Sequence, residues 1–261
     1  MGFLDRFRQK KDDALPEDGS APEPPVGGGD VPSPSAESPL DLAEADEPST
    51  REDQLEWLEE SAREVTAPAF DSRADAEESL VEQYVLDDAY DLTEDDVRTV
   101  LRRVWQERLD EQASWTDEGD YARVRAAFEA LEAEGIVARM NFTCCQNCGH
   151  TEIGDERADD SRGYVFFHQQ DAERLAPGES DLYLAFGGFR YAEGVDAALV
   201  QRAQAGDTEA KQEAIVRSEE LVGAEVTAAL RAQGLTVEWD GTCAQRIQVT
   251  GLDWRKRLPV D

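Results

Sequence analysis

The chain has 261 residues and is strongly acidic, with 59 Asp and Glu against 26 Lys and Arg and a formal net charge of −33. A surface of this sign repels nucleic-acid phosphates at long range, so we expect no nucleic acid among its partners. No apolar run approaches the roughly 18 residues of a membrane-spanning helix, so no transmembrane segment is expected. Residues 1–50 carry −8 of the charge, which leaves −25 for the rest.

Residues 1–11 form a short segment of amphipathic pattern. Phe3, Leu4 and Phe7 would share one side of a helix, opposite four basic residues. Such a peptide can dock on a partner or touch a membrane surface from the periphery. It lacks the apolar stretch and cleavage site of a secretory signal, so we expect a cytoplasmic protein with reduced thiols.

Residues 12–50 hold eight of the eleven prolines, a run of three glycines and many Ser, Asp and Glu residues. Because this segment can bury little apolar surface, we expect a disordered acidic linker rich in Pro, Gly and Ser. The remaining residues, 51–261, are long enough for one sizeable core and are predicted to form a single domain.

The first part of this domain is predicted to be helical. Apolar residues recur at helix spacing from residue 51 to the stop at Pro68, over 73–90, from the N-cap Thr93 to Leu109, and over 118–134. Carboxylates in the first turn after Thr93 favour a helix start there.

The period then changes to two over residues 136–144, which predicts a strand with one buried face. On this pattern Cys144 shares the core face with Met140 and Phe142, and Cys145 points away from it. Two further strands are expected at 163–168 and 182–186.

Residues 195–233 return to a helical pattern that breaks near Gly206, with Asp207 or Thr208 as a cap for the second piece. A strand from Leu235 and a final strand carrying Cys243, Ile247 and Val249 indicate a hairpin. The fold class is therefore α+β: N-terminal helices, then a mixed or antiparallel sheet of about five strands packed against helices.

The stretch from Cys144 to His150, CCQNCGH, is the unusual local motif. Cys145 and Cys148 have the two-residue spacing of a zinc knuckle, in which Gly149 would let the backbone turn toward the sulfurs. Zinc needs four ligands, or three and a water, and the chain has two histidines, His150 and His168. The sequence thus favours thiols with a purely structural role, and the alternative is zinc at Cys145, Cys148, His150 and His168.

A second alternative is a thiol-dependent enzyme. Cys145 and Cys148 could exchange disulfides, or one of them could attack a substrate with His168 as the base. The acidic residues that follow the motif oppose this hypothesis, because they raise the pKa of a nearby thiol. The flanking sequence also lacks the Trp and Pro of thioredoxin-like sites.

Three stretches carry a family resemblance: NFTCCQNCGH at 141–150, GYVFFHQQD at 163–171 and LYLAFG at 182–187. Together they resemble an uncharacterised family found mainly in actinobacteria and described only as a domain of unknown function. The resemblance covers about residues 75–257 and implies a bacterial cytosolic setting. It brings no activity, cofactor or catalytic residue.

The function favoured by these observations is a non-enzymatic interaction or structural domain in the cytosol. Such a domain could bind an unidentified protein partner, and a metal, with zinc as the candidate, could steady the CxxC turn.

Overall fold

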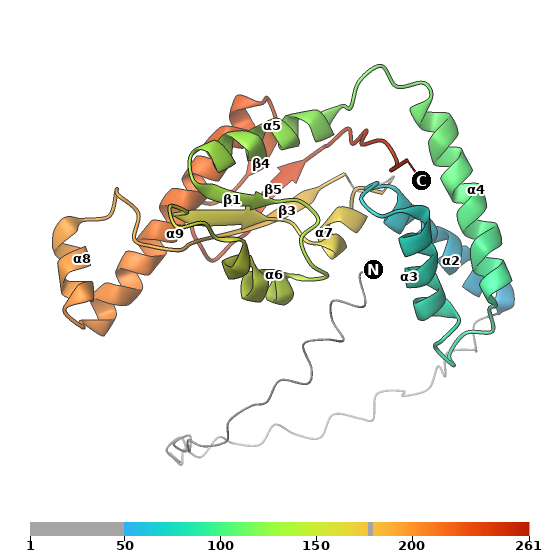
Figure 1. Cartoon of the computed structure of the whole chain (residues 1–261), viewed down its shortest axis with the longest axis horizontal. Helices are drawn as coiled ribbons and strands as arrows, with labels where there is room; N and C mark the ends of the chain where they lie inside the picture. The colour runs from blue at the N-terminus through green and yellow to red at the C-terminus, as the bar shows by residue number, and fades with distance from the viewer. Residues whose placement is uncertain (1–49, 177–179, 261) are drawn as a thin grey trace, which may run out of the picture. The chain divides into compact units, whose positions relative to one another are not determined.

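The computed structural model describes residues 50–176 and 180–260 (Figure 1). The peptide expected at 1–11 and the linker expected at 12–49 lie outside these residues. Contacts divide the chain into two units, residues 1–53 and 54–261. Of the first unit only residues 50–53 are described, and there the Thr50 hydroxyl accepts a hydrogen bond from the Asp53 amide.

Three helices pack around a cluster of their own: α2 (Arg51–Thr66), α3 (Arg73–Tyr84) and α4 (Glu94–Gln112). Helix α4 begins at the predicted N-cap, where Thr93 and Asp96 form a reciprocal capping box. Its apolar stripe is buried as expected from the helical spacing, and the fully or nearly buried members are Val97, Val100, Leu101, Val104 and Trp105. Helix α3 stops six residues before the predicted end.

A five-stranded sheet forms the centre of the rest of the described chain. Its strands are β1 (Ile136–Arg139), β2 (Gly163–Phe166), β3 (Leu182–Gly188), β4 (Thr236–Glu238) and β5 (Ile247–Thr250). They lie in the order β1-β2-β3-β5-β4, with β1 and β2 parallel and the other neighbours antiparallel. The predicted α+β class, the mixed sheet and the final hairpin are thereby confirmed.

One face of the sheet is covered by α5 (Asp120–Ala133) and α9 (Thr208–Ala232) (Figure 1). Apolar side chains from both helices and from alternate strand positions form one large buried cluster, which includes Val124, Phe128, Val165, Leu184, Val222, Leu230 and Ile247. Asp207 caps α9 through the Ala210 amide, as predicted. Helix α9 follows the shorter α8 (Ala197–Gln204) after a break at Gly206.

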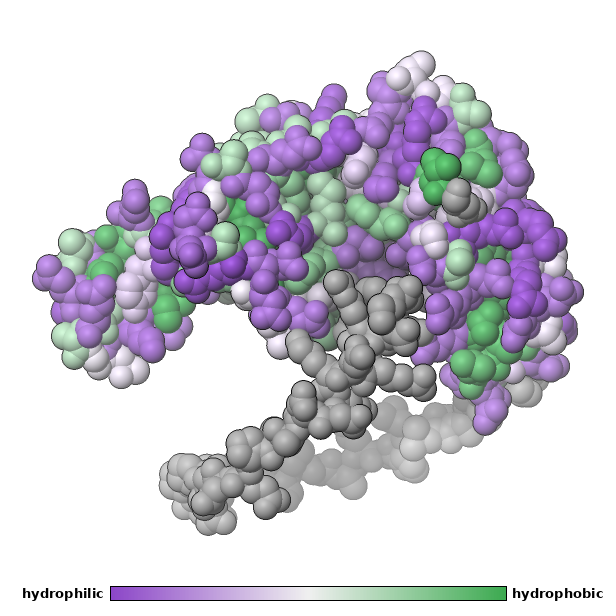
Figure 2. Space-filling view, viewed as in Figure 1, coloured by the Kyte–Doolittle hydropathy of each residue, from purple (hydrophilic) through white to green (hydrophobic). Residues whose placement is uncertain are grey.

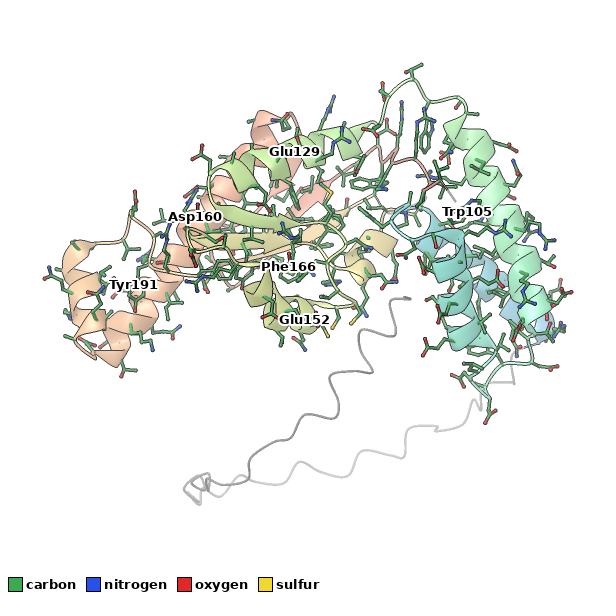
Figure 3. All side chains as sticks on the ribbon, in the orientation of Figure 1. Trp105, Glu129, Glu152, Asp160, Phe166 and Tyr191 are labelled. Carbon is green, nitrogen blue, oxygen red and sulfur yellow. The ribbon has the colours of Figure 1, made fainter. Side chains whose placement is uncertain are left out.

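The opposite face carries α6 (Gln146–Glu152), which continues into the 3-10 turn η1 (Ile153–Glu156). Here a smaller cluster joins Ile153 to Val137, Phe166 and Ala185 of the sheet. Figure 3 shows Phe166 on the side of the sheet that faces α6. The short helix α7 (Gln169–Glu173) follows β2.

The last described residues connect the helical part to the sheet. Trp254 packs in the sheet cluster and donates its indole N–H to the carbonyl of Pro68 at 3.2 Å. Lys256 donates to the carbonyl of Ala69 at 2.6 Å, and Leu258 is buried among the residues of α2–α4. This C-terminal segment (residues 252–258) therefore completes both apolar clusters.

Hydrophilic side chains dominate the face seen in Figure 2, as the composition leads one to expect. Within the described residues, no helix has the length and apolar character needed to cross a bilayer.

Candidate metal centre

Residues 140–145, which we call the thiol loop, follow β1 directly. Cys144 and Cys145 lie in this loop, and Cys148 lies in the first turn of α6. The thiol loop runs alongside the end of β2. The Phe142 amide donates to the Phe167 carbonyl at 2.8 Å, and the Gln169 amide donates to the Thr143 carbonyl at 3.1 Å. These two bonds fix the backbone that leads into Cys144.

Two residues of the thiol loop have left-handed backbone conformations, Asn141 at φ +50° and Thr143 at φ +61°. Such a conformation is unfavourable for any residue with a Cβ and is rare for a β-branched one. The Thr143 hydroxyl donates to the Cys145 carbonyl at 3.2 Å, which helps to hold the bend. Strained backbone of this kind is concentrated at functional sites.

This bend overturns one prediction. Strand β1 ends at Arg139, five residues before the predicted end, so the alternation of faces does not reach Cys144. Met140 packs against the cluster under α5 and α9, whereas Phe142 packs against the cluster under α6. Cys144 is half-buried and lies with the other cysteines of the motif, so its assignment to the core was wrong.

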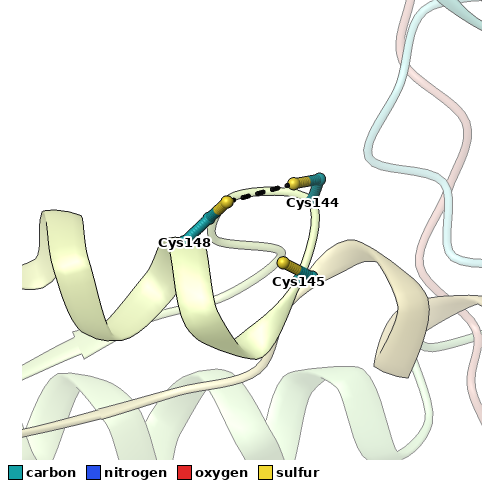
Figure 4. A group of neighbouring side chains, drawn as sticks. All are labelled: Cys144, Cys145 and Cys148. Atoms are coloured by element: carbon teal, nitrogen blue, oxygen red, sulfur yellow. Dashed lines mark hydrogen bonds between the residues drawn. The ribbon is translucent and has the colours of Figure 1, made fainter.

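Three sulfur atoms, those of Cys144, Cys145 and Cys148, all lie within 4.8 Å of one another (Figure 4). The Cys144 thiol contacts the Cys148 sulfur at 3.5 Å. All three side chains are half-exposed. In the described part of the chain, no histidine or carboxylate joins this group.

Helix α6 holds Cys148 in place by lying against the sheet at a glycine. A Cβ on Gly149 would stand 2.3 Å from Cε2 of the Phe166 ring, so any larger residue would push the helix away. Gly149 has an ordinary helical backbone, so close packing is its role and the predicted backbone turn at this residue is absent.

The environments of the thiols differ. Cys145 is the N-cap residue of α6, and the backbone amide and thiol of Cys148 lower the pKa of Cys145 below its usual value. The neighbouring Cys144 and Cys145 thiols, together with some desolvation, raise the pKa of Cys148 to about 12. In the absence of a metal, Cys145 therefore ionises more readily than Cys148.

His150 lies on α6 and faces aromatic rings. Its Nδ1 is 3.0 Å from the Tyr164 hydroxyl, and its Nε2 is 3.4 Å from the Gln146 side-chain nitrogen. The imidazole also meets the Phe166 ring edge-on. Burial is the main cause that lowers the pKa of His150, and the nearby charges of Arg246 and His168 lower it further.

His168 is the N-cap of α7 and is almost fully buried. Its Nδ1 accepts from the Asp171 amide at 3.3 Å, and its Nε2 donates to the Asp171 carboxylate at 2.9 Å. Arg246 donates to the same carboxylate and to the Tyr183 carbonyl. Burial alone would raise the pKa of Asp171, but the hydrogen bonds from His168 and Arg246 outweigh it and hold the pKa below its usual value.

Cys243 is half-exposed and precedes β5, so its predicted place on the core face of a strand was also wrong. Its thiol contacts Glu219 of α9, and burial is the first cause that raises the pKa of Cys243. It does not belong to the three-sulfur group.

Of the four residues predicted to bind zinc, the fold brings together Cys145 and Cys148. It adds Cys144, which strand alternation had excluded. Both nitrogens of His150 and of His168 have contacts elsewhere, and neither imidazole lies in the group. The predicted strand of nine residues exceeds the usual five or six, and Asn141 is a residue that tolerates positive φ. Those two signals could have placed the strand end earlier and recovered Cys144.

Comparison with known proteins gives one match. The model of a family described as a domain of unknown function, DUF6891, matches residues 51–258. No curated protein and no solved structure matches the chain.

Proposed function

The chain belongs to this family of unknown function, and from its site geometry we propose a non-enzymatic interaction or structural domain steadied by zinc at Cys144, Cys145 and Cys148. The observation that carries the proposal is the convergence of three sulfurs at the end of one strand. Zinc bound there would join the thiol loop to α6 and stabilise the face of the sheet on which they lie.

The donor set suits a borderline-soft metal ion. Two thiolates on one tetrahedral zinc lie about 3.8 Å apart, because each Zn–S bond is about 2.3 Å long. Cys144 and Cys148 already stand at 3.5 Å, and the other pairs need to close by no more than about 1 Å. Rotation about the χ1 angles of half-exposed side chains can supply a shift of that size.

Three protein ligands leave a fourth position to a water or to a group from a partner. The two histidines predicted from the sequence are the natural rivals of Cys144 for the third ligand. To bind the metal through one ring nitrogen, His168 would have to give up its contact with either the buried Asp171 carboxylate or the Asp171 backbone amide, and His150 would have to give up its contact with Tyr164 or with Gln146. Cys144 needs no such exchange, so we favour the three-thiolate set.

The backbone of the thiol loop supports a binding role. A left-handed Thr143 costs about 1–2 kcal/mol relative to an ordinary conformation, and backbone strain of this kind is often found at ligand-binding sites. A bound ion would offset this cost.

Zinc binding requires reduced thiols, so we also propose that the protein is cytoplasmic.

Metal analysis after purification without chelators tests the proposal. We expect about one zinc per chain in the wild-type protein and a loss of most zinc in Cys144→Ser, Cys145→Ser and Cys148→Ser. Cys243→Ser is the matched control, because it removes a half-exposed cysteine outside the group. Full zinc in all three site variants would refute the proposal.

The same measurement separates the two ligand sets. If the histidines bind the metal, His150→Ala and His168→Ala lose zinc and Cys144→Ser keeps it. If the three thiols bind it, the pattern is reversed. Replacing zinc with cobalt(II) adds an optical readout, because the intensity of the sulfur-to-cobalt charge-transfer band increases with the number of thiolates bound.

A second candidate function, thiol exchange, is favoured by one observation. Cys145 combines a lowered pKa with a position at the start of a helix, and Cys148 is placed to complete a disulfide with it. Alkylation rates measured against pH test this alternative. A reaction of Cys145 that titrates at or above the reference pKa of about 8.5 would rule it out.

A further inference from the structure

The three-sulfur group is notable for what it lacks. The ligand atoms within 4.8 Å of one another are sulfurs alone, with no imidazole and no carboxylate among the described residues. The chain has only two histidines, and both have contacts elsewhere. A four-coordinate ion must therefore complete its shell from outside the group, whereas a three-coordinate one need not.

We propose that Cys144, Cys145 and Cys148 together capture a neutral trivalent metalloid hydroxide of the arsenous acid type. This inference rests on the proposed function only in that both use the same three thiols. Arsenic capture does not require zinc to be bound. Trivalent arsenic is soft, prefers sulfur to oxygen or nitrogen, and binds three sulfurs as a pyramid with a lone pair at its apex.

The reaction is a condensation without electron transfer. Arsenous acid, As(OH)3, exchanges its three As–O bonds for three As–S bonds. Each thiol proton leaves with one hydroxide as water, so three waters are released and arsenic stays trivalent. No oxidant or reductant takes part.

Charge and access favour this ligand. Arsenous acid is neutral near pH 7 and its tris-thiolate adduct is neutral as well, so capture adds no charge to a chain of net charge −33. Zinc held by three thiolates would leave a net negative charge at the site, in a chain that is already strongly acidic. The three side chains are half-exposed, and Cys144 and Cys148 are already in contact.

The sequence spacing adds a geometric reason. Cys144 and Cys145 are consecutive, and Cys148 lies within the first turn of α6, so one short segment supplies all three sulfurs. Once two sulfurs have bound, the third reacts intramolecularly and adds affinity through its high effective concentration.

The experiment uses the full chain, reduced with a phosphine so that no thiol competes. Arsenous acid is titrated into the protein, and the product is weighed by mass spectrometry under non-denaturing conditions. We expect one arsenic per chain, with a mass gain equal to arsenic minus three hydrogens. In zinc-loaded protein we expect arsenic to displace zinc one for one, followed with a coloured zinc chelator.

Variants identify the three thiols. Each of Cys144→Ser, Cys145→Ser and Cys148→Ser should weaken arsenous acid binding by about 100-fold, because only two sulfurs remain. Cys243→Ser should bind as the wild type does. Phenylarsine oxide, which needs only two thiols, should still bind Cys144→Ser, which shows that the remaining pair of thiols is reactive, and an unchanged circular dichroism spectrum shows that the variant is folded.

The outcomes separate the two proposals. Zinc binding without arsenic capture, an adduct that loses only two hydrogens, or unweakened binding to Cys144→Ser would each overturn the inference and leave the zinc site standing. A three-thiol arsenic adduct in a protein that takes up no zinc would support the inference and refute the zinc proposal.

Discussion

Phe166 and Phe167 are neighbours in sequence and both are fully buried, yet they serve opposite faces of the sheet. The Phe167 ring packs among Phe70, Phe128 and Trp254, in the large cluster beneath α5. The Phe166 ring meets Phe142 and His150, in the small cluster that seats α6. Equal burial thus supports different roles: one face holds the fold together, and the other positions the three thiols.

Phe167→Ala should have the largest effect on stability. Loss of a fully buried aromatic side chain leaves a cavity in the main cluster and should lower the free energy of unfolding by about 3–5 kcal/mol. Chemical denaturation measures this change. Phe166→Ala is the matched variant on the opposite face of the sheet. At a temperature at which both variants are folded, Phe166→Ala should lose more zinc affinity than Phe167→Ala does. Equal zinc affinity in the two variants would show that the faces are not specialised.

Asp171→Asn tests the buried polar network that lies beside these clusters. Asp171 is 3% exposed and its carboxylate accepts from His168 and Arg246, so the change should cost about 2–3 kcal/mol. Because the folded state holds the pKa of Asp171 below its ordinary value of 3.8, the stability it contributes is fully present above that value. It is lost as pH falls through the lower, folded-state pKa.

The free energy of unfolding, measured at several pH values, checks the direction of this pH dependence. The difference between wild type and Asp171→Asn should be constant at neutral pH and should shrink below about pH 4. A difference that instead grows on acidification would contradict the network described for His168, Asp171 and Arg246.

Gly149→Ala tests the packing of α6 against its face of the sheet. The added Cβ would clash with the Phe166 ring, so we expect a loss of about 1–3 kcal/mol and a displaced Cys148. Gly154→Ala is a matched control, because a Cβ there meets nothing within 4 Å. Gly149→Ala combined with Phe166→Leu should recover part of the loss, and independent effects in this double-mutant cycle would argue against the contact.

Thr143→Gly should have the smallest effect on the free energy of unfolding. The direction of this change tests whether the backbone at Thr143 is strained. Relief of the left-handed conformation stabilises the metal-free protein, but the greater freedom of the unfolded glycine and the loss of the bond to Cys145 offset most of the gain. We expect a net increase of about 0.5 kcal/mol with weaker zinc binding. Thr143→Ala keeps the strain and should destabilise the protein, so equal effects of the two substitutions would disprove the strain.

The helical part of the fold could be predicted because its signals are local. Thr93 and Asp207 cap helices through amides three residues ahead, and the stripe on α4 follows from helix spacing alone. Two strands of the α5–α9 face were also predictable, the one at 182–186 as a short run of apolar residues and the last one because its inward positions alternate.

The candidate site could be predicted only in part. The spacing of Cys145 and Cys148 indicated a thiol pair, but the third sulfur depends on a backbone reversal at Asn141 and Thr143 that alternation does not encode. The histidines looked available because sequence does not reveal Tyr164 or Asp171 as their partners. Gly149 was interpreted as a turn residue, because its contact with Phe166 joins two elements that are separate in the chain.

The C-terminal segment has a consequence for the order in which the protein folds during synthesis. Leu258 belongs to the cluster of α2–α4, and Lys256 binds the carbonyl of Ala69, a residue made 187 positions earlier. The three helices therefore leave the ribosome long before the side chain that completes their packing. They must wait with an open apolar surface until residue 258 has left the ribosome, so a stalled or shortened nascent chain should attract chaperones and proteases through that surface.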